Sequence, residues 1–158
     1  MSKTVFMRTA LDLAREGVGR GDGGPFGAVI VQAGTIVGEG WNRVLKTHDP
    51  TAHAEVVAIR DACARLGTFD LSDCEIYASS EPCPMCLGAI YWSRLARVYY
   101  CNASADATAY GFRDDHIYAE MKAAPEERNL PTSRVLIPGA LEVFDYWRQQ
   151  SEKRGSGY

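Results

Sequence analysis

The chain has 158 residues, of which 46% are hydrophobic and 23% charged, and its formal net charge is −3. These values are typical of one globular domain, and the acidic balance argues against a broad nucleic-acid-binding surface. No apolar run reaches the roughly 20 residues that a membrane-spanning helix needs. Charged side chains interrupt the N-terminal residues, so we expect no secretory signal sequence and a cytoplasmic protein.

The first predicted element is a helix over residues 4–16, followed by the glycine-rich stretch "GVGRGDGG". This stretch has neither of the glycine patterns of phosphate-binding loops, so it predicts a flexible connection. Residues 26–31 and 35–40 are rich in β-branched residues and are separated by "QAG", which predicts a hairpin of two strands.

Helices and strands alternate in the rest of the chain. We expect helices at residues 51–66, 84–92 and 141–150, and strands at 74–79, 96–101 and 134–137. Alternation of this kind predicts a three-layer α/β/α fold around a central mixed, largely parallel five-stranded sheet. No linker or repeat divides the chain, so we expect one domain over residues 1–158.

The hexapeptide "EPCPMC" places Cys83 and Cys86 three residues apart. Such a pair could be a redox dithiol, half of a structural zinc site, or part of a catalytic metal site. Pro84 suits the first turn of a helix. It would make Cys83 the cap and Cys86 the third residue of that helix, where the positive end of the helix dipole favours thiolates.

The motif "TAHAEV" supplies His53 and Glu55 one helix–strand unit earlier. If both helices begin at the same end of the sheet, one imidazole and two thiolates meet. Three protein ligands are typical of a catalytic zinc site, because a structural site normally has four. Glu55 is then the natural acceptor for a proton from water, provided that it lies in the first helical turn beside His53.

Each of these residues also has a plainer interpretation when taken alone. A single histidine or glutamate in an alanine-rich helix is usually packed or solvated, and the cysteine pair could be a thioredoxin-like dithiol. The combination of H-x-E with P-C-x-x-C is the signature of zinc deaminases, in which zinc activates water and a glutamate that is not a ligand moves protons.

With these motifs the chain resembles the cytidine/deoxycytidylate deaminase superfamily, whose cytidine deaminase-like fold agrees with the predicted layers. The segments "GGPFGAVIV", "HDPTAHAEVVAIR" and "EPCPMCLGAIYWSR", with the terminal Tyr158, most resemble the bacterial guanine deaminases of this superfamily. The resemblance implies hydrolytic deamination of guanine to xanthine and ammonia, by attack of activated water at C2.

The resemblance also implies roles for individual residues. His53, Cys83 and Cys86 would bind one Zn²⁺ per subunit, with water or hydroxide as the fourth ligand, and Glu55 would shuttle protons. Asp114 would contact the purine edge or assist proton transfer. The other residues implied to bind the substrate are Phe26, Asn42, the backbone of Ala54, Trp92 and Tyr158.

These substrate-binding residues also have structural alternatives. Phe26 and Trp92 could be core aromatics, Asn42 could serve a turn, and Asp114 could cap a helix that starts at Asp115. Because Asp114 and Asp115 are adjacent, either could face the pocket.

The resemblance also implies a homodimer in which residues 140–158, a C-terminal helix and tail, are exchanged between subunits. Tyr158 would then close the pocket of the partner, although it could instead be a disordered terminus. Alternative substrates are guanosine or another purine nucleoside, and adenosine in transfer RNA, which the acidic charge disfavours. A redox role for the cysteine pair is the alternative that involves no hydrolysis.

Overall fold

The computed structural model describes residues 2–155, which divide into two compact units, one ending at Tyr118 and one beginning at Ala119. No helix of the described residues is long and apolar enough to cross a membrane. The first unit holds α1 (Lys3–Gly19), β1 (Gly27–Gln32), β2 (Thr35–Trp41), α2 (Val44–Thr47), α3 (Ala54–Leu66), β3 (Cys74–Ser80), α4 (Pro84–Trp92), β4 (Arg97–Asn102) and α5 (Ser104–Ala109). Helix α6 (Asp115–Lys122) spans the division, and the second unit adds the 3₁₀ helix η1 (Pro125–Glu127) and α7 (Glu142–Arg154).

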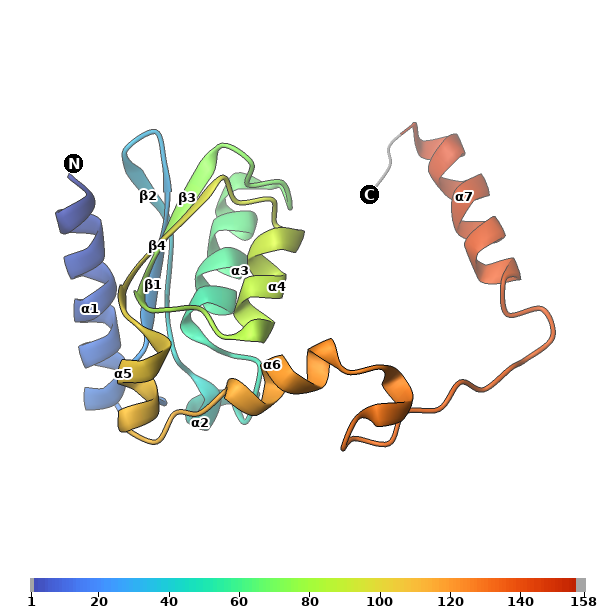
Figure 1. The fold of residues 1–158 in the computed structure, drawn as a ribbon. Coiled ribbons are helices and arrows are strands. Elements are labelled where there is room, and N and C mark those ends of the chain that lie inside the picture. Colours follow the sequence, from blue (N-terminus) through green and yellow to red (C-terminus); the bar gives the residue numbers. More distant parts are fainter. Residues whose placement is uncertain (1, 156–158) are drawn as a thin grey trace. The chain divides into compact units, whose positions relative to one another are not determined.

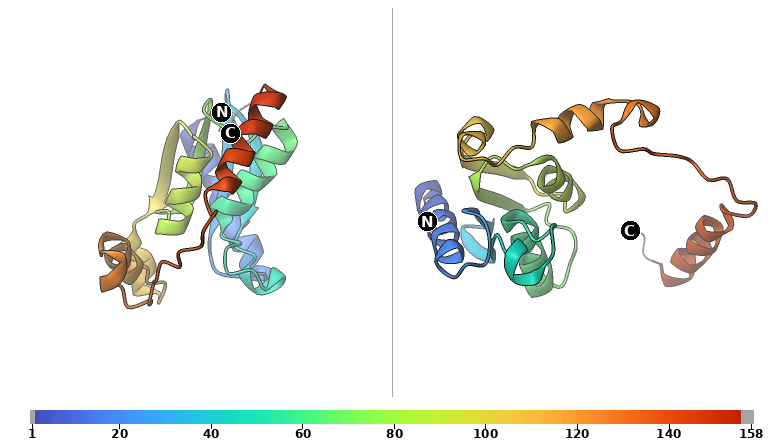
Figure 2. Two further views of the ribbon diagram at one scale, coloured as in Figure 1. Left: turned by 90° about the vertical axis from the view of Figure 1, so that its right-hand side faces the viewer. Right: turned by 90° about the horizontal axis from the view of Figure 1, so that it is seen from below.

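The first unit is a sheet between two layers of helices, which confirms the predicted α/β/α layering. Helix α1 lies on one face of the sheet, and α3 and α4 lie side by side on the other (Figures 1 and 2). The strand order is β2-β1-β3-β4, so β4 is an edge strand.

The structure corrects the strand count and the strand directions. The sheet of the described residues has four strands, in which β1 is antiparallel to both β2 and β3, and only β3 and β4 are parallel. The expected fifth strand at residues 134–137 is not formed within residues 2–155. A strand exists only when its backbone groups pair with a neighbour, and this segment has no partner strand in the described chain.

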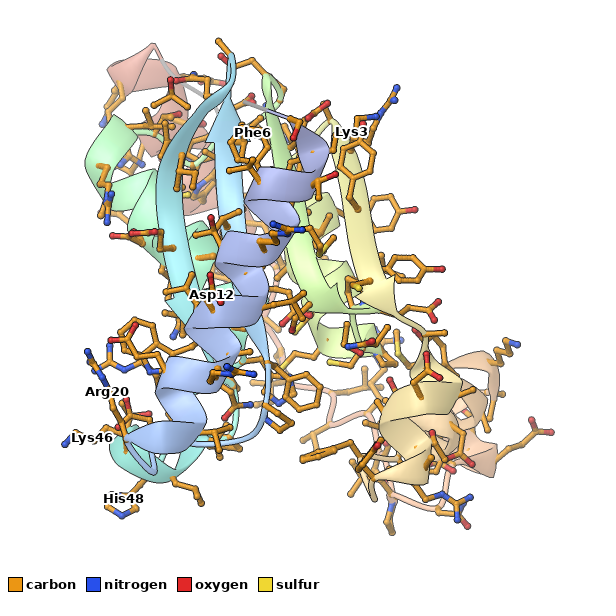
Figure 3. The ribbon with its side chains drawn as sticks, turned by 90° about the vertical axis from the view of Figure 1, so that its left-hand side faces the viewer. Lys3, Phe6, Asp12, Arg20, Lys46 and His48 are labelled. Atoms are coloured by element: carbon orange, nitrogen blue, oxygen red, sulfur yellow. The ribbon has the colours of Figure 1, made fainter. Side chains whose placement is uncertain are left out.

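Two apolar clusters hold the layers together. On the α1 side, Phe6 packs with the buried Val29, Val31 and Tyr77. Figure 3 shows α1 lying across the strands with Phe6 directed toward them, and the Lys3 ammonium lies 4.4 Å from the centroid of the Tyr99 ring. The cluster on the α3 and α4 side combines alanines with larger side chains. The alanines are Ala28, Ala54, Ala58, Ala62 and Ala78, and the other buried residues are Ile30, Ile59, Leu71, Cys74, Ile76 and Ile90.

Small residues let α3 approach the sheet closely. A Cβ at Gly40 would collide with the backbone oxygen of Ala54 and lie 2.5 Å from the backbone nitrogen of Ala58. Gly38 meets Ala58 and Ala62 one turn further along the helix. The two glycines therefore fix the height of α3 above β2, and with it the position of the first helical turn.

We expect Gly40→Ala to destabilise the protein by about 1–3 kcal/mol, because the added methyl group has no space between β2 and α3. Thermal unfolding of the purified variant measures this effect. Gly19→Ala is the matched control, since a Cβ at Gly19 meets nothing within 4 Å. Equal melting temperatures for the two variants would contradict the role given to Gly40.

Candidate metal centre and substrate pocket

Two helix N-termini supply the metal-ligand candidates. His53 is the N-cap of α3, Cys83 is the N-cap of α4, and Cys86 is the third residue of α4. Neither helix has a side-chain hydrogen bond at its cap. The backbone N–H groups of both first turns and the positive ends of both helix dipoles lie at this group, which favours negatively charged sulfur.

The three side chains form a compact group. The Sγ atoms of Cys83 and Cys86 each lie 3.5 Å from Nδ1 of His53, and all three ligand atoms lie within 4.8 Å of one another. Among residues 2–155 this is the group of histidine, cysteine and acidic side chains that could hold a metal ion. The structure thus confirms that the N-termini of α3 and α4 meet, as predicted.

Without a metal, the two thiols share a proton unequally. A hydrogen bond from Cys86 lowers the pKa of Cys83 to about 4, and the same contact, together with burial, raises the pKa of Cys86. The hydrogen bond with Cys83 also raises the pKa of His53. One sulfur is thus a thiolate, while the other keeps its proton until a cation displaces it.

Glu55 lies beside this group. It is the second residue of α3 and is only 7% exposed, and its Oε2 lies 3.4 Å from the Cys86 Sγ. Burial raises the pKa of the Glu55 carboxyl. A carboxyl group with a raised pKa binds a proton more readily than an exposed one, which suits general acid–base catalysis.

The donor set fits Zn²⁺ better than a harder cation. One imidazole nitrogen and two thiolates are soft or borderline ligands, two thiolates neutralise the charge of the ion, and three protein ligands leave room for a substrate or solvent ligand. Glu55, although close, does not belong to the ligand group. The arrangement therefore agrees with the catalytic interpretation of the cysteine pair.

A cavity of about 540 Å³ opens beside the ligand group. It lies at one end of the strands, where β1 begins after Phe26, β2 ends before Asn42, and β3 ends at Ser80. Glu55 and Asp114 also line the cavity. Open α/β sheets commonly bind ligands in a crevice just beyond the carboxyl ends of their strands.

Asn42 presents a defined group to this cavity. It is only 6% exposed, and its Oδ1 accepts the backbone N–H of Val44 at 3.2 Å. Its amide NH₂ group is therefore the part left to donate to a ligand. A Cβ at Gly23 would collide with Asn42 Oδ1, so only glycine fits there while Asn42 keeps this position.

The structure separates the two adjacent aspartates. Asp114 lines the cavity, whereas Asp115 is exposed and pairs with Arg113, whose Nη2 lies 3.2 Å from its Oδ2. Asp114 precedes α6, which begins at Asp115. Of the two registers that the sequence allows, the structure brings Asp114 to the cavity.

Two of the other predicted residues, Ala54 and Trp92, are not among the described residues that line the cavity. Ala54 is fully buried directly after His53. Trp92, at the end of α4, is 73% exposed and does not line the cavity, so its pocket role stays a prediction. Tyr158 lies outside the described residues.

Sequence reasoning missed several cavity residues. Phe112 packs edge-on against Phe26, with ring centroids 4.9 Å apart, and Glu81, Ser104 and Arg113 also line the cavity. Glu81 directly precedes the "PCPMC" motif and Arg113 directly precedes Asp114. These positions in the sequence could have marked both residues as candidates for the cavity. Ser104 gave none, because only the fold brings it near these residues.

Comparison with known proteins shows the family of the chain. Residues 1–102 match the family described as the cytidine and deoxycytidylate deaminase zinc-binding region.

The chain belongs to this family.

Among its members, guanine deaminase of Bacillus subtilis (strain 168) is 50% identical over 154 residues, which cover 98% of this chain and 99% of that protein. An X-ray structure of guanine deaminase from Bacillus subtilis superposes with a TM-score of 0.92 at 51% identity, covering 94% of this chain and 95% of that one. A tRNA-specific adenosine deaminase of Aquifex aeolicus (strain VF5) is 43% identical over 100 residues, which cover 63% of this chain and 66% of that protein.

Binding of zinc to the group of His53, Cys83 and Cys86 should release protons. Cys86 keeps its proton at neutral pH because its pKa is raised, and His53 binds a proton more readily than usual, but ligation needs thiolate and neutral imidazole. The apparent zinc affinity should therefore rise with pH, by about tenfold per pH unit for each proton released. Competition with a chelator across neutral pH measures it.

The exposed Cys101 provides the control for this measurement. Cys101→Ser should keep both the affinity and its pH dependence, whereas Cys86→Ser should weaken binding. A zinc affinity that does not change with pH would contradict the protonation assigned to Cys86.

Proposed function

We propose that the protein is a zinc-dependent aminohydrolase that converts guanine to xanthine and ammonia, in purine breakdown or salvage. The observation that carries this proposal is the cavity in which Glu55 and Asn42 lie beside the group of His53, Cys83 and Cys86. The likeness to guanine deaminase, which extends over nearly the whole chain, supports guanine as the substrate.

We propose one zinc ion per subunit, held by Nδ1 of His53 and the two cysteine sulfurs. When bound, zinc lowers the pKa of water so that water can act as a nucleophile at neutral pH. Reduced thiols are needed for this ligation, which agrees with the cytoplasmic location that the sequence predicts.

Glu55 would move the protons. Its buried carboxylate takes a proton from the attacking water and delivers it to a ring nitrogen of the base. It then takes the second proton from the hydroxyl group formed at C2 and delivers it to the amine, which leaves as ammonia while the C2 carbonyl forms. The raised pKa of Glu55 means that its carboxylate takes up a proton more readily than an exposed carboxylate, as a general base requires.

Other side chains would hold and orient the base. The Asn42 amide donates to an acceptor such as the carbonyl oxygen of guanine, and Asp114 accepts from an N–H group of the base or assists proton transfer. Phe26, with Phe112 packed against it, provides an apolar wall. An apolar wall excludes water, which strengthens each charge interaction in the cavity.

Ammonia release from a panel of substrates tests the assignment. The zinc-loaded protein should release ammonia from guanine faster than from guanosine, adenine, cytosine or cytidine, because its residues are placed for a free purine base. Zinc-loaded protein that releases no ammonia from guanine would refute the proposal.

Glu55→Gln is the matched control for this assay. The amide has the shape of the carboxyl group but cannot move a proton, so turnover should fall by a factor of about 10² or more, while zinc content and melting temperature stay unchanged. Unchanged turnover would exclude Glu55 as the proton carrier.

Deamination of adenosine in transfer RNA is the weaker alternative. Similarity to the Aquifex aeolicus tRNA-specific adenosine deaminase covers 63% of the chain, against 98% for the guanine deaminase of Bacillus subtilis. The net charge of −3 also disfavours a polyanion partner. Tight, salt-sensitive binding of transfer RNA together with inosine formation would favour this alternative.

We further propose a homodimer in which the C-terminal segment, including residues 140–158, is exchanged between subunits. Helix α7 has no buried residue, and Val135, Leu136 and Ile137 are each at least 66% exposed. Strand β4 lies at a sheet edge, where it can accept a further strand. Residues 134–137 of a second copy would supply the fifth strand that is absent from the described chain, and Tyr158 would close the partner's pocket.

A mixing experiment tests the exchange. Co-expression of Glu55→Gln, which keeps its tail, with a chain that lacks the tail should yield about a quarter of the wild-type turnover per pocket, because half of the dimers then contain one complete pocket. Each chain expressed alone should be nearly inactive. Dimers without any restored activity would contradict the exchange.

A further inference from the structure

We propose that Ser104 is a positioning residue, held in place by Glu81, that orients the Asp114 carboxylate toward the purine base. The inference rests on the proposed function and deepens it. It concerns three half-buried side chains of the first unit that line the same cavity.

Hydrogen bonds join the three residues in a chain. The Ser104 hydroxyl donates to Oδ1 of Asp114 at 3.3 Å, and the backbone N–H of Ser104 donates to Oε2 of Glu81 at 2.9 Å. The backbone N–H of Glu81 in turn donates to the carbonyl of Asn102 at 2.8 Å. Ser104 is therefore fixed by its backbone, which leaves its hydroxyl free to direct Asp114.

The Ser104 hydroxyl has one hydrogen to donate, and Asp114 Oδ1 receives it. Within residues 2–155 the Asp114 carboxylate accepts this hydrogen bond through Oδ1, and its Oδ2 remains available to a ligand. Asp115 differs, because Arg113 binds both of its carboxylate oxygens at 3.2–3.3 Å. The two adjacent aspartates are thus held by different partners, and only Asp114 is held at the cavity.

The far end of the segment that carries Asp114 is also anchored. The Tyr118 hydroxyl donates to the carbonyl of Pro82 at 3.4 Å, so contacts to Glu81 and Pro82 bracket residues 104–118. Cys83 follows directly. These contacts fix the position of Asp114 relative to the loop before Cys83, a candidate metal ligand, although no hydrogen bond joins Asp114 to Cys83.

Function depends on this arrangement because a base held between Glu55 and Asp114 needs both carboxyl groups at fixed positions. Small displacements of a group that orients the substrate reduce rates strongly, since reacting atoms must be held in near-attack geometry. Loss of the Ser104 hydroxyl would release the Asp114 carboxylate without disturbing His53, Cys83 or Cys86.

Ser104→Ala is the first test. We expect kcat/KM for guanine to fall by about tenfold, with zinc content and melting temperature as in the wild type. Ser104→Thr, which keeps the hydroxyl, should retain most of the activity. Thr9→Ala is the matched control, because the Thr9 hydroxyl donates to the Val5 carbonyl on the exposed face of α1, away from the cavity lining, and its loss should change nothing.

The decisive measurement is made in an Asp114→Ala background. With no carboxylate to orient, adding Ser104→Ala should change the residual kcat/KM by less than about twofold. A tenfold loss in both backgrounds would show that Ser104 supports the fold or another group, and would overturn the inference. Wild-type activity in Ser104→Ala would overturn it as well.

If Ser104→Ala does not fold, Glu81 carries the same test. Glu81→Gln keeps an oxygen that can accept the Ser104 N–H and should stay active, whereas Glu81→Ala should lose activity in the wild-type background and not in the Asp114→Ala background. Equal activities of the two Glu81 variants would overturn the inference. A wild-type protein that is inactive on guanine would refute the proposed function first, and the positioning role with it.

Discussion

The convergence of two helix N-termini is the constraint on which the rest of the structure depends. Helix α3 begins at His53 and α4 begins at Cys83, and their first turns bring one imidazole and two thiols within 4.8 Å. Exposed backbone N–H groups and helix dipoles make this point electropositive, which stabilises thiolate before any cation arrives. A displacement of either helix by an ångström or two would break the group.

Close packing of small residues maintains the convergence. Glycines on β2 and alanines on α3 let the helix backbone lie nearly in contact with the strand, so its first turn has little freedom. Pro84 fixes the start of α4 in the same way, since its ring is suited to a first helical turn. The site is therefore built on rigid elements, which a metal centre with fixed ligand distances needs.

The cavity wall is made differently from the metal centre. Asn42 and Asp114 come from segments outside the helices and strands, and each is held by one or two hydrogen bonds. Such segments can change without disturbing the metal ligands. This division is consistent with the similarity of the chain both to a guanine deaminase and, over 63% of its length, to a tRNA-specific adenosine deaminase.

The sequence by itself determined the α/β layering, the pairing of His53 with Glu55, and the placement of Cys83 and Cys86 in one helical turn. These features depend on local spacing, capping and proline geometry, which are written in neighbouring residues. Only the tertiary structure decided that β1 runs antiparallel to β3, that Asp114 rather than Asp115 lines the cavity, and that Ser104 and Glu81 meet. Strand direction and contacts between residues 23 positions apart depend on how the elements pack together, and no local pattern specifies that packing.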